Sequence, residues 1–269
     1  MKKLFASLVV FTLFASSMAQ TYSVVIHTNK GDIRAELFDD TPRHRNEFVR
    51  LARAGHFNGT LFYRSVRDFV IQGGSSDSRN APTGKHIGYG DEAVNIDSEF
   101  TKKHFHKRGA LCAPRQPDKI NMLKTSDISQ FYIVCGKVYP DSILDKIEKS
   151  INIPIKKQLR KLYYLPNKER LAELKATDKV AYNALAKEIR DKMDFEYSIS
   201  DHKEFTPEQR EAYTTIGGTP ELDNEYTVFG QVTSGIDVVQ RINKQKTDKN
   251  ERPLEDVKII RIEVIEHGK

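Results

Sequence analysis

Short runs of alternating apolar and polar residues constrain the fold of this chain more than any other feature. The first two runs, 22–28 and 33–38, flank Asn29-Lys30-Gly31-Asp32, which is typical of a hairpin turn. Runs of the same kind recur at 61–66, 69–72, 109–113, 130–134, 227–232 and 257–264. Two stretches far apart along the chain, 41–55 and 234–243, have helical patterns instead. Together they predict a mainly β fold, a closed antiparallel barrel with a helix at each end.

One segment, 141–213, interrupts the β-pattern, because its apolar residues recur at helical spacing. Pro154 is expected to divide its first helix in two, since proline cannot donate the helical hydrogen bond. The segment holds 15 basic and 14 acidic residues, so it is not an electrostatic arm. We interpret it as a helical insertion between two parts of one barrel, 20–140 and 214–269.

The first 19 residues have the pattern of a secretory signal peptide. Lys2 and Lys3 precede an apolar stretch, 4–14, and Ser17-Met18-Ala19 supplies the small residues that a signal peptidase requires. An anchor helix is the alternative, although the apolar stretch is short for crossing a bilayer. We expect export, with a periplasmic or secreted mature chain. No later apolar run is long enough for a membrane span in the mature chain.

Charge and cysteine usage exclude some function classes. Charged residues make up 30% of the chain and the formal net charge is +6, but the basic residues are spread along it. Nucleic-acid binding favours a concentrated basic face, so no nucleic acid partner is expected. Cys112 and Cys135 either pair, as an exported protein allows, or remain buried thiols. Their spacing does not resemble a metal site.

Three segments combine apolar strands with conspicuous polar residues. The first, 61–74, places Arg64 among apolar neighbours and Gln72 beside two glycines. Burying a guanidinium costs free energy unless it is hydrogen-bonded, so Arg64 belongs either to the barrel wall or surface, or to a site. The second, 129–134, follows a Ser-Gln pair with two aromatic residues, and the third, 222–232, feeds a tight turn into a strand. Each segment alone is compatible with an ordinary strand.

Taken together in this order, the segments resemble the cyclophilin family of peptidyl-prolyl isomerases. The matching stretches read FYRSVRDFVIQGG, SQFYI and LDNEYTVFGQV, and the opening helix ends in NEFVRLARAG. The resemblance covers about 22–136 and 216–266 and leaves out the helical insertion. It implies an eight-stranded cyclophilin-like barrel and cis–trans isomerisation of peptide bonds that precede proline.

The resemblance also implies a role for individual residues. Arg64 stands where the family has its catalytic arginine. The positions implied to bind substrate are Phe69, Val70, Gln72, Ala113, Pro114, Arg115, Gln130, Tyr132, Leu222 and Tyr226. Tyr132 replaces a pocket phenylalanine, Tyr226 replaces a histidine, and Val70 replaces the methionine usual in eukaryotic members.

Such a reaction needs few catalytic groups. Rotation about an X–Pro bond has a barrier of about 18–20 kcal/mol, because amide resonance is lost in the twisted state. No covalent bond breaks, so no metal, nucleophile or cofactor is required. A fixed arginine donor stabilises the twisted amide more than either planar form. The implied partners are proline-containing peptides and unfolded or exported client proteins.

Two alternatives are left open by the sequence. The same fold could serve a non-catalytic proline-peptide binding protein or holdase chaperone, although such a protein would not need Arg64 and Gln72. The insertion begins soon after Tyr132 and ends just before Leu222, so it is expected to emerge beside the groove. It is either a lid or client-binding arm, or a self-packed addition with no role in binding.

Overall fold

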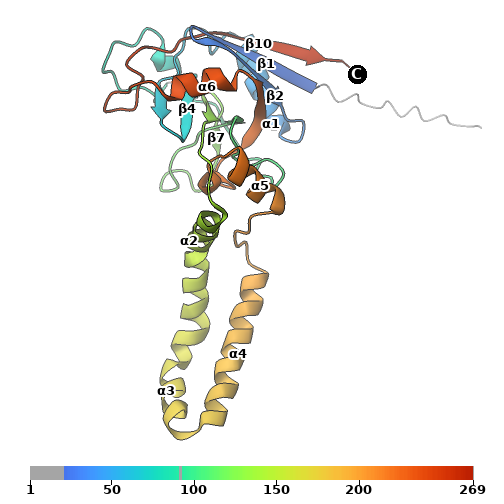
Figure 1. Ribbon diagram of the computed structural model, residues 1–269, viewed down its shortest axis with the longest axis vertical. Helices are drawn as coiled ribbons and strands as arrows, with labels where there is room; N and C mark the ends of the chain where they lie inside the picture. Colours follow the sequence, from blue (N-terminus) through green and yellow to red (C-terminus); the bar gives the residue numbers. More distant parts are fainter. Residues whose placement is uncertain (1–20, 91–92, 269) are drawn as a thin grey trace, which may run out of the picture.

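An eight-stranded antiparallel sheet forms the body of the molecule in the computed structural model, which describes residues 21–90 and 93–268. The predicted signal peptide, 1–19, lies outside the described residues. The strand order is β10-β1-β2-β9-β6-β8-β4-β3 (Figure 1). The strands are β1 (Thr21–Thr28), β2 (Gly31–Leu37), β3 (Arg64–Val66), β4 (Val70–Gly73), β6 (Ala110–Cys112), β8 (Phe131–Val134), β9 (Val228–Ser234) and β10 (Ile259–His267). A second, two-stranded sheet pairs β5 (Asn95–Ile96) with β7 (Ser126–Asp127).

The sheet curls without closing into a continuous ladder. Its two edge strands, β3 and β10, are not paired with each other. One isolated bridge joins Leu61 to Lys258, just before these two strands begin. Nearby, the backbone N–H of Phe62 donates to the carbonyl of Val257 at 2.8 Å. Because β3 has only three residues, its outer edge offers few groups for a ladder. The structure is therefore an open half-barrel of eight strands, and the predicted closed barrel is not confirmed.

Two helices lie against the sheet within the stretches that predicted them. Helix α1 (Pro42–Arg53) packs against β9 and β10, and α6 (Ile236–Asn243) packs against β2, β3 and β4. Helix α1 buries Phe48, whose ring lies 5.0–5.6 Å from the rings of Phe57, Phe131 and Phe229. All four rings are fully buried. This aromatic cluster is the part of the core beneath α1, and it supports β8 and β9, which border the site.

The predicted insertion is helical throughout most of its length. Figure 1 shows α2 and α4 as a long arm extending from the sheet, with α3 at the far end and α5 at the base. The segments are α2 (Asp141–Leu159), the π-helical turn η2 (Arg160–Tyr164), the 3₁₀ turn η3 (Leu165–Asn167), α3 (Lys168–Thr177), α4 (Lys179–Ser198) and α5 (Pro207–Thr215). In residues 21–90 and 93–268, no helix is both long and apolar enough to cross a bilayer.

The division expected at Pro154 is wrong, because α2 continues through this residue. Proline removes one hydrogen bond, the one that its nitrogen would have donated to the carbonyl of Ser150. Ser150 is exposed, so water can satisfy that carbonyl at low cost. The last helix of the insertion, α5, begins with a reciprocal capping box between Thr206 and Gln209.

Candidate functional site

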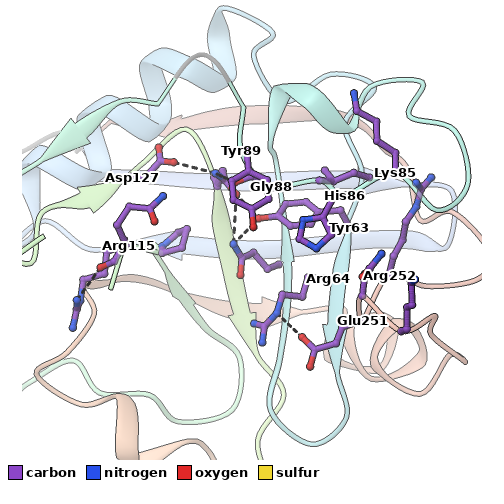
Figure 2. A pocket seen from close by; sticks show the side chains of 17 residues that line it. Tyr63, Arg64, Lys85, His86, Gly88, Tyr89, Arg115, Asp127, Glu251 and Arg252 are labelled. Carbon is purple, nitrogen blue, oxygen red and sulfur yellow. Dashed lines mark hydrogen bonds and ion pairs between the residues drawn. The ribbon is translucent and has the colours of Figure 1, made fainter. Parts of the chain in front are cut away.

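Arg64 is the first residue of β3 and lies opposite Gln72 of β4. Its side chain is 34% exposed, and its Nε donates to Oε2 of Glu251 at 2.7 Å (Figure 2). Glu251 has a φ of 64°, which is uncommon for a residue other than glycine. Backbone outliers of this kind cluster at functional sites. The ion pair fixes the orientation of a half-exposed guanidinium at the wall of a pocket.

A cavity of about 230 Å³ lies beside Arg64 and gathers most of the predicted site. It is lined by Arg64, Phe69, Val70, Gln72, Pro114, Arg115, Tyr132, Leu222 and Tyr226. These nine residues come from five separate places in the chain. The rings of Tyr132 and Tyr226 meet edge to face at 5.9 Å, and both pack on a small apolar cluster that includes Val70. The result is a pocket whose walls are mostly apolar, with Arg64, Gln72 and Arg115 as the polar residues of its lining.

Two of the predicted residues do not line this cavity. Ala113 is completely buried and belongs to the main core, where its N–H donates to the carbonyl of Thr227 at 3.1 Å. Gln130 lines an adjoining cavity instead. Ala113 directly follows β6 and Gln130 directly precedes β8, so both lie beside strands that border the site, Ala113 in the core and Gln130 at the adjoining cavity.

The adjoining cavity has a volume of about 460 Å³ and is more polar (Figure 2). It shares Arg64, Gln72, Pro114 and Arg115 with the smaller cavity, so the two form one groove with Arg64 at the junction. The remaining lining residues are Tyr63, Lys85, His86, Ile87, Gly88, Tyr89, Gln116, Asp127, Gln130, Lys249, Asn250, Glu251 and Arg252. The groove therefore joins a mainly apolar cavity to a more polar one.

A hydrogen-bond network orients Gln72 at this junction. Its Nε2 donates to the hydroxyl of Tyr63 at 2.6 Å, and that hydroxyl donates to Oε1 of Gln130. Nε2 of Gln130 donates in turn to Oδ2 of Asp127 at 3.0 Å. Burial, followed by the negative charge of Asp77, raises the pKa of Tyr63, so its hydroxyl stays protonated. With its nitrogen fixed, Gln72 has a defined side-chain orientation.

Arg115 shapes the rim of the smaller cavity. Its Nε donates to the carbonyl of Glu225 at 2.6 Å, and its terminal nitrogens bind the carboxylates of Glu225 and Asp118 at 2.7 and 2.5 Å. Its guanidinium lies 4.9 Å from the centre of the Tyr226 ring. Since its side chain is only 5% exposed, Arg115 supports Tyr226 and the rim more than it offers donors to a ligand.

Tyr132 lies opposite Gln72 where β8 pairs with β4, and its hydroxyl is hydrogen-bonded. Nε2 of His106 lies 2.9 Å from it, and Nδ1 of His106 lies 3.0 Å from Oδ1 of Asp223. All three side chains are buried. Burial, followed by the neighbouring Cys112 thiol, raises the pKa of Tyr132, so the ring stays neutral.

Several residues of this arrangement were not predicted: Tyr63, His106, Asp223 and Glu251, and also Asp118, Asp127 and Glu225 around Arg115 and Gln130. Tyr63 and Asp223 lie inside the segments 61–74 and 222–232, so their neighbours Arg64 and Leu222 could have drawn attention to them. His106 and Glu251 have no such signal. Glu251 is 187 residues from Arg64 along the chain, and only the fold brings them together.

Comparison with known proteins points to one family. The sequence model described as "Cyclophilin type peptidyl-prolyl cis-trans isomerase/CLD" matches residues 23–151 and 177–264. A curated protein of Staphylococcus saprophyticus, named "Putative peptidyl-prolyl cis-trans isomerase", is 28% identical over 248 residues, which is 90% of this chain and 91% of the relative. A protein of the same name from Staphylococcus aureus is 29% identical over 247 residues, with 90% and 91% covered. Since 90% of the chain is covered, the likeness extends into the helical insertion.

A solved structure agrees in fold. The crystal structure of a cyclophilin-type peptidyl-prolyl cis-trans isomerase of Cryptosporidium parvum has a TM-score of 0.51 and 19% sequence identity. The match covers 93% of this chain and 99% of that one. At this identity the likeness concerns the arrangement of the strands and helices alone.

Proposed function

The chain belongs to the family of cyclophilin-type peptidyl-prolyl cis-trans isomerases, and from this premise we propose that Arg64 is the catalytic residue and that the smaller cavity holds the substrate proline. The observation that carries the proposal is the juxtaposition of an oriented guanidinium with an apolar pocket. A proline ring needs an apolar pocket, and the twisted amide needs a donor beside that pocket. Arg64 and the residues around the cavity of about 230 Å³ meet both requirements.

The catalytic effect follows from differential binding. In the planar amide the prolyl nitrogen is conjugated with the carbonyl, and it accepts hydrogen bonds poorly. In the twisted state this nitrogen becomes pyramidal and basic, so a donor from Arg64 stabilises the twisted state most. The carboxylate of Glu251 keeps the guanidinium in place before substrate arrives. Gln72, held by Tyr63, is placed to bind the peptide backbone on the same side.

The remaining substrate contacts follow the groove. Phe69, Tyr132 and Leu222 close around the proline ring, while the residues before proline run past Pro114 toward the larger cavity. Pro114 lines both cavities, which supports a path of the peptide along this residue from one cavity to the other.

We also propose that the clients are exported proteins, which the enzyme helps to fold in the periplasm or outside the cell. Support comes from the basic, apolar and small-residue pattern of the first 19 residues. The expected result is a mature protein that begins near residue 20 and is recovered from the exported fraction. Recovery of the full-length chain from the cytoplasm would contradict this part of the proposal.

A protease-coupled assay of cis–trans exchange in a proline-containing tetrapeptide tests the catalytic assignment. We expect Arg64→Ala to lower kcat/KM by about 100-fold to 1,000-fold, as the loss of one transition-state donor does in other enzymes. Arg67→Ala is the matched control, because Arg67 is exposed three residues away. If wild type and Arg64→Ala were equally slow, near the spontaneous rate of tens of seconds, the protein would be a binding protein or holdase.

A further inference from the structure

The insertion reaches the proline pocket through a buried chain of polar contacts. The chain starts at the Tyr132 hydroxyl, passes through the His106 ring and ends at the Asp223 carboxylate. Asp223 directly follows Leu222, another pocket residue, in the sequence. Its position therefore bears on two walls of the pocket, through the backbone to Leu222 and through His106 to Tyr132.

Three side chains from the insertion contact Asp223: Lys203 and Tyr213 closely, and Gln209 more distantly, with its Nε2 3.5 Å from Oδ2. Nζ of Lys203 lies 3.0 Å from Oδ2, and the hydroxyl of Tyr213 donates to the carboxylate at 2.8 Å. The side chains of Lys203 and Asp223 are only 7% and 2% exposed. Burial alone would raise the pKa of Asp223, but the hydrogen bond from His106 and the charge of Lys203 hold it below its usual value. Lys203 thus neutralises a buried carboxylate that borders the pocket.

Lys203 is itself fixed to the first helix of the insertion. Asn152, a buried residue of α2, exchanges two hydrogen bonds with the backbone of Lys203: Nδ2 donates to its carbonyl at 2.8 Å, and Oδ1 accepts from its N–H at 2.7 Å. Two residues further on, the N–H of Phe205 donates to Glu148 of the same helix at 3.0 Å. The segment between α4 and α5 is therefore attached to α2 at the base of the arm.

We infer that Lys203 and Tyr213 are positioning residues of the isomerase site, so that the base of the insertion is part of the proline pocket. Asp223 can only accept, so we assign the proton of the His106 ring to Nδ1. Nε2 then accepts from the Tyr132 hydroxyl, which fixes the Tyr132 ring in the pocket wall. A phenylalanine at this position could not form that bond. The inference uses the proposed site, and adds to it residues that touch no substrate.

The competing explanation is that the network stabilises the fold and has no effect on the pocket. The two explanations differ in kinetics. A loosened Tyr132 wall weakens binding of the proline ring in planar and twisted states alike, which raises KM and leaves kcat unchanged. A loss of folded enzyme lowers the apparent kcat and leaves KM unchanged. The split between KM and kcat therefore separates positioning from stability.

Tyr213→Phe and Lys203→Met are the test variants, and Lys187→Met is the control. Tyr213→Phe keeps the ring, which packs on Phe105 and Phe205, so we expect it to fold. Lys187 also lies in the insertion, but it is exposed and pairs with Asp191 far from the network. We expect Tyr213→Phe, and the folded fraction of Lys203→Met, which loses a buried cation, to raise KM for the tetrapeptide about threefold to tenfold, the worth of one hydrogen bond, with kcat per folded molecule changed less than about twofold. The control should match wild type.

Tyr132→Phe and Tyr213→Phe, alone and together, form a double-mutant cycle. If Lys203 and Tyr213 act through the Tyr132 hydroxyl, Tyr213→Phe should raise KM little further once that hydroxyl is gone. Wild-type KM in folded Tyr213→Phe and Lys203→Met, or effects that simply add to that of Tyr132→Phe, would overturn the inference. If Lys203→Met does not fold, Tyr213→Phe decides.

Calorimetric titration of the same tetrapeptide keeps this result separate from the proposed function. The dissociation constant should rise by the same factor as KM in both variants. A wild type that binds the peptide without isomerising it would refute the catalytic assignment, while the dissociation constants of the variants would still decide the inference about Lys203 and Tyr213.

Discussion

The ion pair between Arg64 and Glu251 gives the sharpest test of how the catalytic donor is held. Glu251→Gln keeps the size of the side chain and one acceptor oxygen. The backbone at this position, with a φ of 64°, is equally uncommon for glutamate and for glutamine. Only the charge is lost. The hydrogen bond from Nε of Arg64, at 2.7 Å, becomes a neutral one. Charge-assisted hydrogen bonds are roughly twice as strong as neutral ones, so orientation of the guanidinium weakens by about 1 kcal/mol.

The weaker orientation of the guanidinium should lower the rate of isomerisation and leave the stability of the fold almost unchanged. The side chains of Arg64 and Glu251 are 34% and 45% exposed, and an ion pair in such a place contributes about 0–1 kcal/mol to folding. For a chain of this size, the melting temperature should fall by no more than about 4 °C. In contrast, about 1 kcal/mol lost in the twisted state lowers kcat about fivefold. KM should stay unchanged, because Arg64 acts most strongly in that state.

The protease-coupled assay measures this effect, with Glu255→Gln as the control. Glu255 forms an ion pair of 2.9 Å with Lys30, and neither residue lines the groove. The control should retain wild-type kcat. A Glu251→Gln enzyme with wild-type kcat, alongside an Arg64→Ala enzyme that is slow, would show that Arg64 needs no fixed orientation and would refute the reasoning.

Three further predictions follow from buried groups. Gly218→Ala should lower the free energy of unfolding by about 1–3 kcal/mol in urea titrations, because its Cβ would come within 2.3 Å of the His106 carbonyl; an unchanged midpoint would contradict the crowding. Burial raises the pKa of Cys135 to about 12 and that of Cys112 well above its usual value, so neither thiol should react with a thiol reagent at pH 8 until the protein is denatured. The pKa of Asp223 is depressed in the folded state, so its contribution to stability is complete above the usual value of 3.8 and is lost as pH falls through the folded value. Urea unfolding between pH 7 and pH 3 should therefore depend less on pH in Asp223→Asn than in wild type, and equal slopes would refute this account.

The strands were predictable because alternation encodes them locally, whereas the pocket residues were predicted from motifs that resemble a known family. Alternation over a few residues identified all eight strands of the sheet, and the resemblance to the cyclophilin family then placed Val70, Tyr132 and Leu222. Closure of the sheet was not predictable in this way. It depends on how many hydrogen bonds β3 can form at the outer edge, and a three-residue strand and a longer one look alike in an apolar run.

The supporting contacts could not be predicted, because they join distant residues through single atoms. His106 and Asp223 are 117 residues apart, and neither belongs to a periodic pattern. The prediction that Pro154 divides the helix was wrong for a different reason. Its local rule is sound, but an exposed helix can hydrate the one carbonyl that proline leaves unpaired. Local sequence rules predicted the helices and strands. The surroundings of each residue in the fold determined where such a rule, for example that for proline in a helix, does not hold.

The last prediction concerns the arm and asks which part of the insertion the pocket needs. Deleting 141–213 as a whole removes Lys203 and Tyr213 and leaves the buried Asp223 carboxylate without its cation. A group in that state is strongly destabilising, so we expect this deletion to lose activity on every substrate. Loss of activity in this variant would therefore not show that the arm binds clients.

Replacing only 156–198 by a short glycine–serine turn is the cleaner experiment. Nζ of Lys156 lies 4.9 Å from the centre of the Tyr197 ring, so the two helices are close enough there for a short turn to join them. The base, including Asn152 and Lys203, is kept. We expect the shortened protein to have wild-type kcat and KM on the tetrapeptide. A KM raised as much as in Tyr213→Phe would contradict the inference that the base of the insertion is the part that positions the pocket. On an unfolded protein, a client-binding arm predicts slower refolding, since the shortened arm lacks the exposed Leu162 and Phe195. Equal rates on the protein substrate would leave the arm outside client binding and confine the role of the insertion to its base.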